Sequence, residues 1–233
     1  GQELSKDNQL IISNFIDCVK NNNIQELSIK VTYPLRRECP IPEIQNQKEF
    51  QKRYSEVFDA KLINEIISSN PLKDWSEVGW RGIMLNNGEL WLDLDGNLFA
   101  VNYQSEFEAK KKMQLINAEK SNLHESIKEF QKPICILETA KFRIRIDQMS
   151  DGVYRYASWA LKSEMNEKPD LIINKGIYIS EGSGGNHTYE FKNGNYTYDC
   201  SIIILGEENS PPARLIVYNG EKEVLAQNAR LKK

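Results

Sequence analysis

Apolar residues recur at helical spacing in the first part of the chain and at strand spacing in the last part. Within residues 6–20, apolar side chains recur at helical spacing, which predicts an amphipathic helix; they are Leu10, Ile11, Phe15, Cys18 and Val19. The same spacing predicts further helices at residues 24–31, 46–60 and 62–68. Asn70-Pro71 ends this helical region.

Two glycine turns divide residues 79–103 into three strand-like runs. Asn86-Asn87-Gly88 is the first turn, and Asp95-Gly96-Asn97 is the second. Asn-Gly and Asp-Gly turns between alternating apolar residues are a strong hairpin signal, so this segment predicts an antiparallel meander. Strand alternation from residue 90 to 95 places three leucines on the face that packs against the helices, and Trp91, Asp93 and Asp95 on the opposite face.

The second half of the chain is rich in short alternating runs. A polar stretch at residues 105–131 predicts a long linking helix, which Pro133 ends. Strands are then expected at residues 142–146, 152–161, 171–181, 186–191, 196–204, 214–218 and 223–229. On 196–204, alternation places Tyr198 and Cys200 on one face, and Cys200 is expected to point into the core.

These patterns predict an α+β chain of two domains. Residues 1–131 would form N-terminal helices packed on a curved, cone-like antiparallel sheet, together with the linking helix. Residues 132–233 would form a small all-β sandwich or barrel of about eight strands.

Charge and hydropathy exclude two classes of partner. The net charge is −3 and acidic and basic residues are mixed along the chain, so no basic block is present to bind nucleic acid. No apolar run reaches the roughly 20 residues that a membrane-spanning helix needs. The chain starts at Gly1 without a preceding Met, so we expect an exported protein whose signal was removed, and a lipid anchor on the removed segment stays open.

Four cysteines are present, but they do not form a metal-binding pattern. The chain has no Cys-x-x-Cys motif and only two histidines, so we expect no metal site and no cofactor. Two interpretations stay open: four buried thiols, or two disulfides formed in an oxidising compartment. Each half carries two of them, Cys18 and Cys39 in the first and Cys135 and Cys200 in the second, so both bridges could form within a domain.

Residues 8–103 contain several short motifs in a recognisable order. They are Phe15-Ile16-Asp17-Cys18-Val19-Lys20, Tyr33-Pro34-Leu35-Arg36, Lys48-Glu49-Phe50 with Tyr54 and Phe58, Arg81-Gly82-Ile83-Met84-Leu85, Gly88-Glu89-Leu90-Trp91 and Ala100-Val101-Asn102. This segment resembles exported bacterial members of the nuclear transport factor two-like, or cystatin-like cone, superfamily. The resemblance implies helices packed on a curved sheet whose concave face forms a pocket. Some members of that superfamily are isomerases or dehydratases, and many only bind ligands or partners.

Candidate chemistry is confined to the meander. Asp93 and Asp95 are a weak catalytic pair, since like charges on one strand face raise a carboxyl pKa, but Asp is also common beside turns. Trp80, Arg81, Trp91 and Asp93 are the expected ligand-binding set, because indole rings stack on planar ligands and Arg binds carboxylates. The alternative is that the indoles belong to the core and that Arg81 pairs with Glu89 across the hairpin.

The sequence therefore favours an exported, non-catalytic two-domain protein of the periplasm or cell envelope of a bacterium, which binds a partner protein or a small ligand there. One alternative is a cone-pocket enzyme, isomerase or hydrolase-like, with a carboxylate base. Another is a structural module of a larger envelope assembly. A buried carboxylate in a deep pocket would favour the enzyme.

Overall fold

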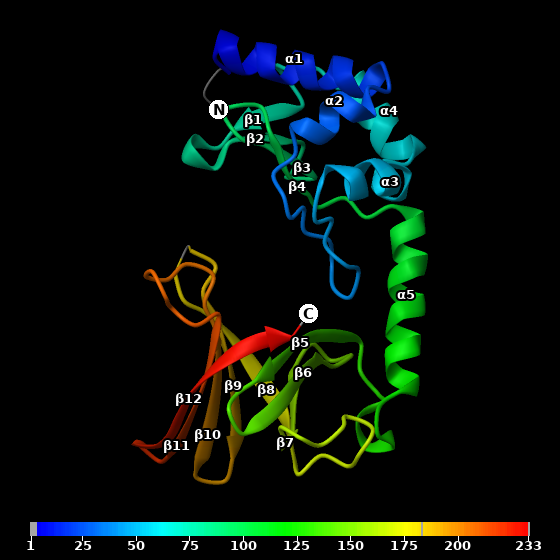
Figure 1. The fold of residues 1–233 in the computed structure, drawn as a ribbon. Helices are drawn as coiled ribbons and strands as arrows, with labels where there is room; N and C mark the ends of the chain where they lie inside the picture. The colour runs from blue at the N-terminus through cyan, green and yellow to red at the C-terminus, as the bar shows by residue number, and fades with distance from the viewer. Residues whose placement is uncertain (1–3, 183, 233) are drawn as a thin grey trace. The chain divides into compact units, whose positions relative to one another are not determined.

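The computed structural model describes residues 4–182 and 184–232. The chain divides into two compact units, residues 1–115 and 116–233, with helices and a small sheet in the first and a closed barrel in the second (Figure 1). The boundary expected near residue 131 assumed one helix over residues 105–131. Helix α5 instead spans Glu106–Ser121 and is followed by a short 3-10 helix, η2 (Glu125–Ile127).

Four helices begin the first unit, as the hydrophobic spacing predicts. They are α1 (Lys6–Lys20), α2 (Ile24–Ile29), α3 (Gln47–Val57) and α4 (Ala60–Ser68). The side chains of Ser5, Asn46 and Asp59 accept hydrogen bonds from backbone N–H groups in the first turns of α1, α3 and α4. These caps satisfy backbone donors that have no partner inside a helix, so they fix where each helix starts.

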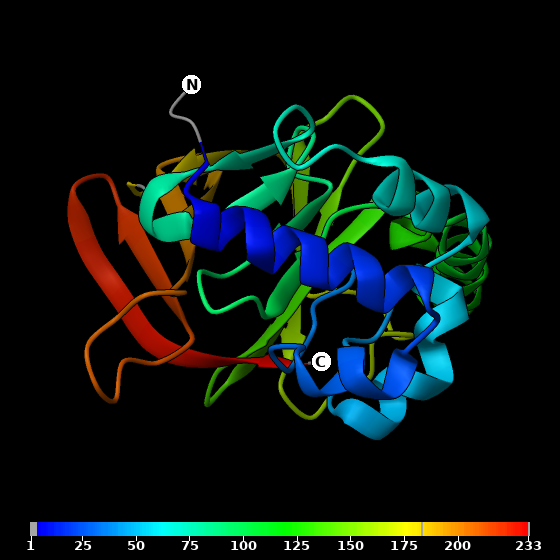
Figure 2. The same ribbon diagram turned by 90° about the horizontal axis from the view of Figure 1, so that it is seen from above.

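A four-stranded antiparallel sheet completes the first unit. Its strands are β1 (Trp75–Glu77), β2 (Ile83–Leu85), β3 (Leu90–Leu92) and β4 (Leu98–Val101), in that order across the sheet. Helix α1 runs across this sheet in both ribbon views (Figures 1 and 2). Ile12 and Phe15 of α1 belong to the same buried cluster as Leu85 and Leu90, so the sheet turns one face to the helices.

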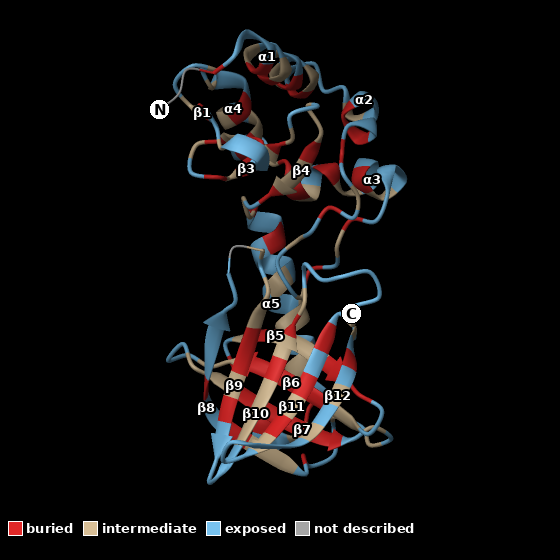
Figure 3. Cartoon of the chain, turned by 90° about the vertical axis from the view of Figure 1, so that its left-hand side faces the viewer, coloured by how far each residue is buried: buried red, intermediate tan, exposed pale blue. Residues whose placement is uncertain are grey.

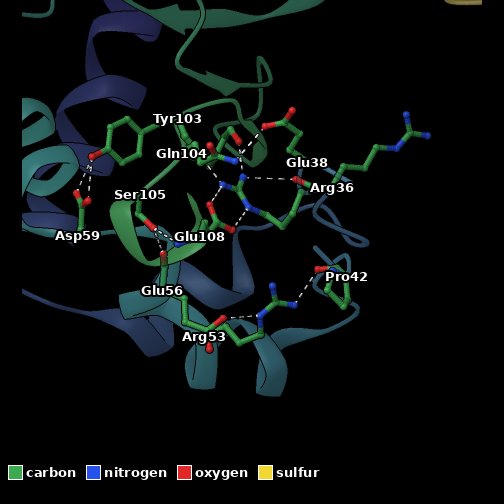
Figure 4. A network of polar contacts seen from close by, with 12 residues as sticks. Arg36, Glu38, Pro42, Arg53, Glu56, Asp59, Tyr103, Gln104, Ser105 and Glu108 are labelled. Atoms are coloured by element: carbon green, nitrogen blue, oxygen red, sulfur yellow. Dashed lines mark hydrogen bonds and ion pairs between the residues drawn. The ribbon is translucent and has the colours of Figure 1, made fainter. Parts of the chain in front are cut away.

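The start of α5 is held by an arginine from the loop after α2. Arg37 donates from Nε to Glu108 Oε1 at 2.7 Å and from Nη2 to Glu108 Oε2 and to the Tyr103 carbonyl oxygen. Its Nη1 donates to the Val101 carbonyl oxygen at the end of β4. Figure 4 shows Glu108 within this network, with Ser105 donating to the Glu56 carbonyl oxygen beside it.

The second unit is a closed antiparallel barrel of eight strands. They are β5 (Lys132–Glu138), β6 (Phe142–Gln148), β7 (Tyr154–Ala160), β8 (Leu171–Ser180), β9 (His187–Asn193), β10 (Tyr196–Ile202), β11 (Ala213–Asn219) and β12 (Lys222–Lys232). Each strand pairs with the next, and β12 returns to pair with β5, so of the two expected architectures the barrel is the one that forms. In the described part of the chain, three residue pairs join β12 to β5, Arg230–Lys232 with Ile136–Glu138.

Alternate residues of the strands fill the barrel interior, and burial alternates along the strands in Figure 3. Cys200 is fully buried in this core and lies opposite Leu215 on β11 and Tyr189 on β9. The expectation that Cys200 points into the core is confirmed. Burial raises the pKa of its thiol well above the usual value, with neighbouring Cys135 adding to the effect.

Part of the outer face of the barrel is also buried. Arg145 points away from the barrel interior, as its strand position predicts, yet it is almost fully buried. Its guanidinium pairs with Asp147 and Glu119, and its Cζ lies 4.8 Å from the centroid of the Phe130 ring. Arg155 of β7 donates to Asp147 and to the carbonyl oxygens of residues 127 and 129. These hydrogen bonds hold the segment around η2 against the outer face of the barrel.

Candidate functional site

The expected ligand-binding residues of the first unit lie in two separate settings. Trp80 and Arg81 belong to a 3-10 turn, η1 (Gly79–Arg81), between β1 and β2. Trp80 is 83% exposed, and Arg81 Cζ lies 5.8 Å from the centroid of the Trp80 ring. The structure thus brings these two neighbours together on the surface.

Trp91 and Asp93 are engaged in local turn contacts. Trp91 Nε1 donates to the Gly88 carbonyl oxygen at 3.1 Å, and its ring lies 6.1 Å from that of Phe99. Asp93 Oδ1 accepts from the backbone N–H groups of Asp95 and Asn97, and Oδ2 accepts from the Asn97 amide. Both carboxylate oxygens of Asp93 therefore stabilise the turn between β3 and β4.

The expected strand alternation through residues 90–95 is wrong beyond Leu92. Strand β3 ends there, and residues 93–97 form the turn. Leu90 and Leu92 are buried as predicted, whereas Leu94 is 47% exposed and does not join the core. Asp95 is exposed and lines a small cavity of about 60 Å³ beside Ile11.

Glu65 and Glu89 form a second pair of carboxylates in the first unit, which the sequence pattern did not indicate as a pair. The Asn86 amide nitrogen donates to both Glu65 Oε1 and Glu89 Oε2, so it joins α4 to the turn between β2 and β3. Burial and the neighbouring Glu89 raise the pKa of Glu65. The alternative in which Glu89 pairs with Arg81 across the hairpin is not what forms: Glu89 Oε2 accepts a hydrogen bond from the Asn86 amide at 3.1 Å.

A concave site with a mainly apolar lining is in the barrel. Strands β6, β8, β10 and β12 begin at one end, here called the hairpin end, which carries the loops 139–141, 161–170, 194–195 and 220–221. A pocket of about 300 Å³ opens there. Ten residues line it: Phe142, Tyr156, Ser158, Asp170, Leu171, Tyr196, Tyr198, Leu215, Val217 and Leu225.

The walls of this barrel pocket are aromatic and aliphatic, with few polar groups. The rings of Tyr156 and Tyr198 lie 5.5 Å apart, and Tyr196 is exposed near the opening. Burial raises the pKa of Tyr156 and of Tyr198, so both hydroxyls stay neutral and protonated around neutral pH. A concave, mostly apolar cavity with a few polar groups is the usual form of a small-molecule site.

Sequence reasoning came close to this site without finding it. The alternation in residues 196–204 places Tyr196, Tyr198 and Cys200 on one face, and the structure turns that face into the barrel. The pocket itself needs residues of six strands and of the loop before β8 to meet at one end, which no local pattern reveals.

The cysteines are not disulfide-bonded in the structure. Cys18 is half-buried and Cys200 fully buried, and the side chains of Cys135 and Cys200 both pack in the barrel core. Among residues 4–182 and 184–232, no three His, Cys, Asp or Glu side chains are grouped so as to hold a metal ion. Within the same ranges, every helix is too short or too polar to cross a membrane.

Comparison with known proteins finds no matching family model, no similar curated protein and no similar solved structure.

Proposed function

We propose that this is a non-catalytic binding protein whose barrel holds one small, mainly apolar ligand in the pocket at its hairpin end. The observation that carries the proposal is the barrel pocket itself, about 300 Å³ and lined mainly by aromatic and aliphatic side chains. Eight-stranded antiparallel barrels are just wide enough to enclose a small ligand. The volume falls at the lower end of the range for small-molecule sites, which favours a ligand of modest size.

A binding role agrees with how the other candidate groups are used. Both carboxylate oxygens of Asp93 accept hydrogen bonds within the turn, which supports a structural role for that residue. The pocket offers hydroxyl groups with raised pKa values and one carboxylate, Asp170, which suits holding a molecule more than transforming it.

One observation favours the alternative of an enzyme in the first unit. Glu65 and Glu89 lie close together and the pKa of Glu65 is raised, a pairing that can create a general acid or base. We rank it second because the two carboxylates share Asn86, whose amide already accounts for their position.

We also propose that the protein is exported and located at the cell envelope. We further propose that residues 8–103 belong to the cone-like superfamily that they resemble. Fractionation of cells that produce the protein from its complete natural gene tests the location. Recovery in the periplasmic or envelope fraction would support it, and recovery in the cytoplasmic fraction would contradict it.

The binding proposal is tested with an uncharged fluorescent probe, N-phenylnaphthylamine, titrated into the full-length protein. We expect saturable binding of one probe per chain. Leu225→Trp should fill the pocket and weaken binding by at least about tenfold. Val224→Trp is the matched control, because Val224 is the preceding residue on β12, is 49% exposed and is not among the residues that line the pocket. Absence of saturable binding to the unmodified protein, or equal losses in the two variants, would contradict the proposal.

A further inference from the structure

The chemical groups around the barrel pocket also bear on the charge of its ligand. We propose that the pocket selects an organic cation, an ammonium or similar group attached to an apolar body. This inference rests on the proposed function, since it assigns the ligand class of the same pocket.

The first observation concerns Asp170, the only charged residue among the ten that line the pocket. It is exposed at the rim, directly before the first residue of β8. Its Oδ2 accepts a hydrogen bond from the backbone N–H of Ala160 at 3.0 Å, which holds the side chain in place. Among the described residues it has no ion pair, so its negative charge is available to a ligand that enters the pocket.

The second observation is the aromatic character of the same opening. Tyr196 is the first residue of β10, and Phe142 is the first residue of β6, so both rings lie at the hairpin end with Asp170. Tyr198 follows one step deeper and stacks at an angle on Tyr156. Aromatic faces carry partial negative charge and attract cations, most strongly when water is excluded.

The third observation is what the lining lacks. None of the ten lining residues is Lys, Arg or His, so the lining has no positive group that could bind a ligand carboxylate or phosphate. The tyrosine hydroxyls and Ser158 are neutral. A negatively charged ligand would therefore lose its hydration at the pocket opening and meet only the like charge of Asp170.

The deeper wall supplies the apolar part of the recognition. Leu215 and Val217 of β11 are buried, Leu225 of β12 lies beside Val217, and Leu171 adds a further apolar side chain from β8, which is not adjacent to β11. A ligand that places its apolar body against these residues leaves its charged group at the rim, beside Asp170 and Tyr196. The ligand class is therefore a cation with an apolar tail of modest length.

Three probes that differ only in their end group test the charge preference in the unmodified, full-length protein. They are phenylbutylammonium, phenylbutanol and phenylbutyrate, each titrated against bound N-phenylnaphthylamine. We expect the ammonium compound to displace the uncharged probe at about tenfold lower concentration than the alcohol, and the carboxylate to be weakest.

A matched pair of variants locates the effect. Asp170→Asn removes the charge and keeps an oxygen that can accept from the Ala160 N–H, so the loop should keep its conformation. It should weaken phenylbutylammonium about tenfold and leave phenylbutanol unchanged. Asp151→Asn is the control, because Asp151 is also exposed and accepts from a backbone N–H, but lies in the turn between β6 and β7 at the opposite end of the barrel.

The outcomes separate the two proposals. If the uncharged probe binds and the three compounds displace it equally, or the carboxylate displaces it best, the barrel is a binding site and the charge preference is overturned. Failure of the uncharged probe to bind at all overturns the binding proposal, and the charge preference with it. The comparison of end groups in the unmodified protein decides the matter even if Asp170→Asn fails to fold.

Discussion

The guanidinium of Arg37 and the carboxylate of Glu108 form a two-point ion pair inside the first unit, where their side chains are only 3% and 2% exposed. The pair joins the loop after α2 to the first turn of α5. The remaining Arg37 donors bind backbone carbonyl oxygens of residues 101 and 103, so the arginine also fixes the path of the chain after β4.

Loss of one partner of this pair should destabilise the first unit strongly. Glu108→Gln leaves the Arg37 charge buried without compensation, which typically costs about 3–5 kcal/mol. Urea unfolding followed by tryptophan fluorescence measures the loss, since Trp75, Trp80 and Trp91 all lie in this unit. The control is Glu26→Gln in the exposed pair with Lys30, where a change below about 1 kcal/mol is expected. Similar losses of unfolding free energy in the two variants would show that the buried pair does not stabilise the first unit.

The carboxylate pair of Glu65 and Glu89 should make the first unit more stable as the pH falls from about 7 to about 5. Because the folded-state pKa of Glu65 is raised above its unfolded value, the folded protein binds that proton more tightly. The stabilisation is complete below the unfolded pKa and is lost as the pH rises through the folded pKa. Glu65→Gln should therefore raise the free energy of unfolding at pH 7, by up to about 1 kcal/mol, and flatten this pH dependence.

A glutamate with the opposite shift provides the comparison. The backbone N–H of Gln45 and the nearby Arg53 lower the pKa of Glu49, so its contribution is present at pH 7 and is lost as the pH falls. Glu49→Gln should lower the stability at pH 7. Unfolding curves recorded for both variants across this pH range should thus diverge in opposite directions from the unmodified protein, and a shared direction would rule out the assigned shifts.

The contact between Gly176 and Phe191 limits substitution inside the barrel. A methyl group at residue 176 would lie 2.2 Å from Cε1 and 2.3 Å from Cδ1 of Phe191. Gly176→Ala should destabilise the barrel by about 1–3 kcal/mol through overpacking. Phe191→Leu removes the obstructing ring, so the double variant should lose less stability than the sum of the single losses. Strict additivity in thermal or urea unfolding would mean that the glycine is needed for another reason.

The helical elements were accessible from the sequence because their signals are local. The spacing of apolar residues predicts a helix over residues 6–20, and the structure has it there. Strand β3 shows the limit of such reasoning. Leu90, Leu92 and Leu94 look alike in an alternating pattern, but the turn formed by Asp93 and Asn97 ends the strand before Leu94 can reach the core.

The barrel could be predicted only as one of two architectures. Alternating strands bury one face equally well in a sandwich and in a barrel, and closure depends on pairing between β5 and β12, as in the contact of Glu138 with Arg230, 92 residues apart in sequence. Strand β5 itself was not assigned, because Pro133 near its start is unusual within a sheet. The barrel pocket was out of reach for the same reason, since its residues meet only once the barrel has closed.

The pairing of β5 with β12 has a consequence for how the barrel may be cut and rejoined. The last residues of β12 lie beside the second half of β5 in an antiparallel ladder, with Lys232 opposite Ile136, so the end of β12 runs toward the start of β5. A linker that runs alongside residues 132–135 could join the two strands, and new termini could be opened at the Asn193-Gly194-Asn195 turn, where the chain is exposed. Such a circularly permuted barrel would keep every ladder. Every strand of the closed barrel is paired on both sides, so β5 is the first strand only in the order of the sequence.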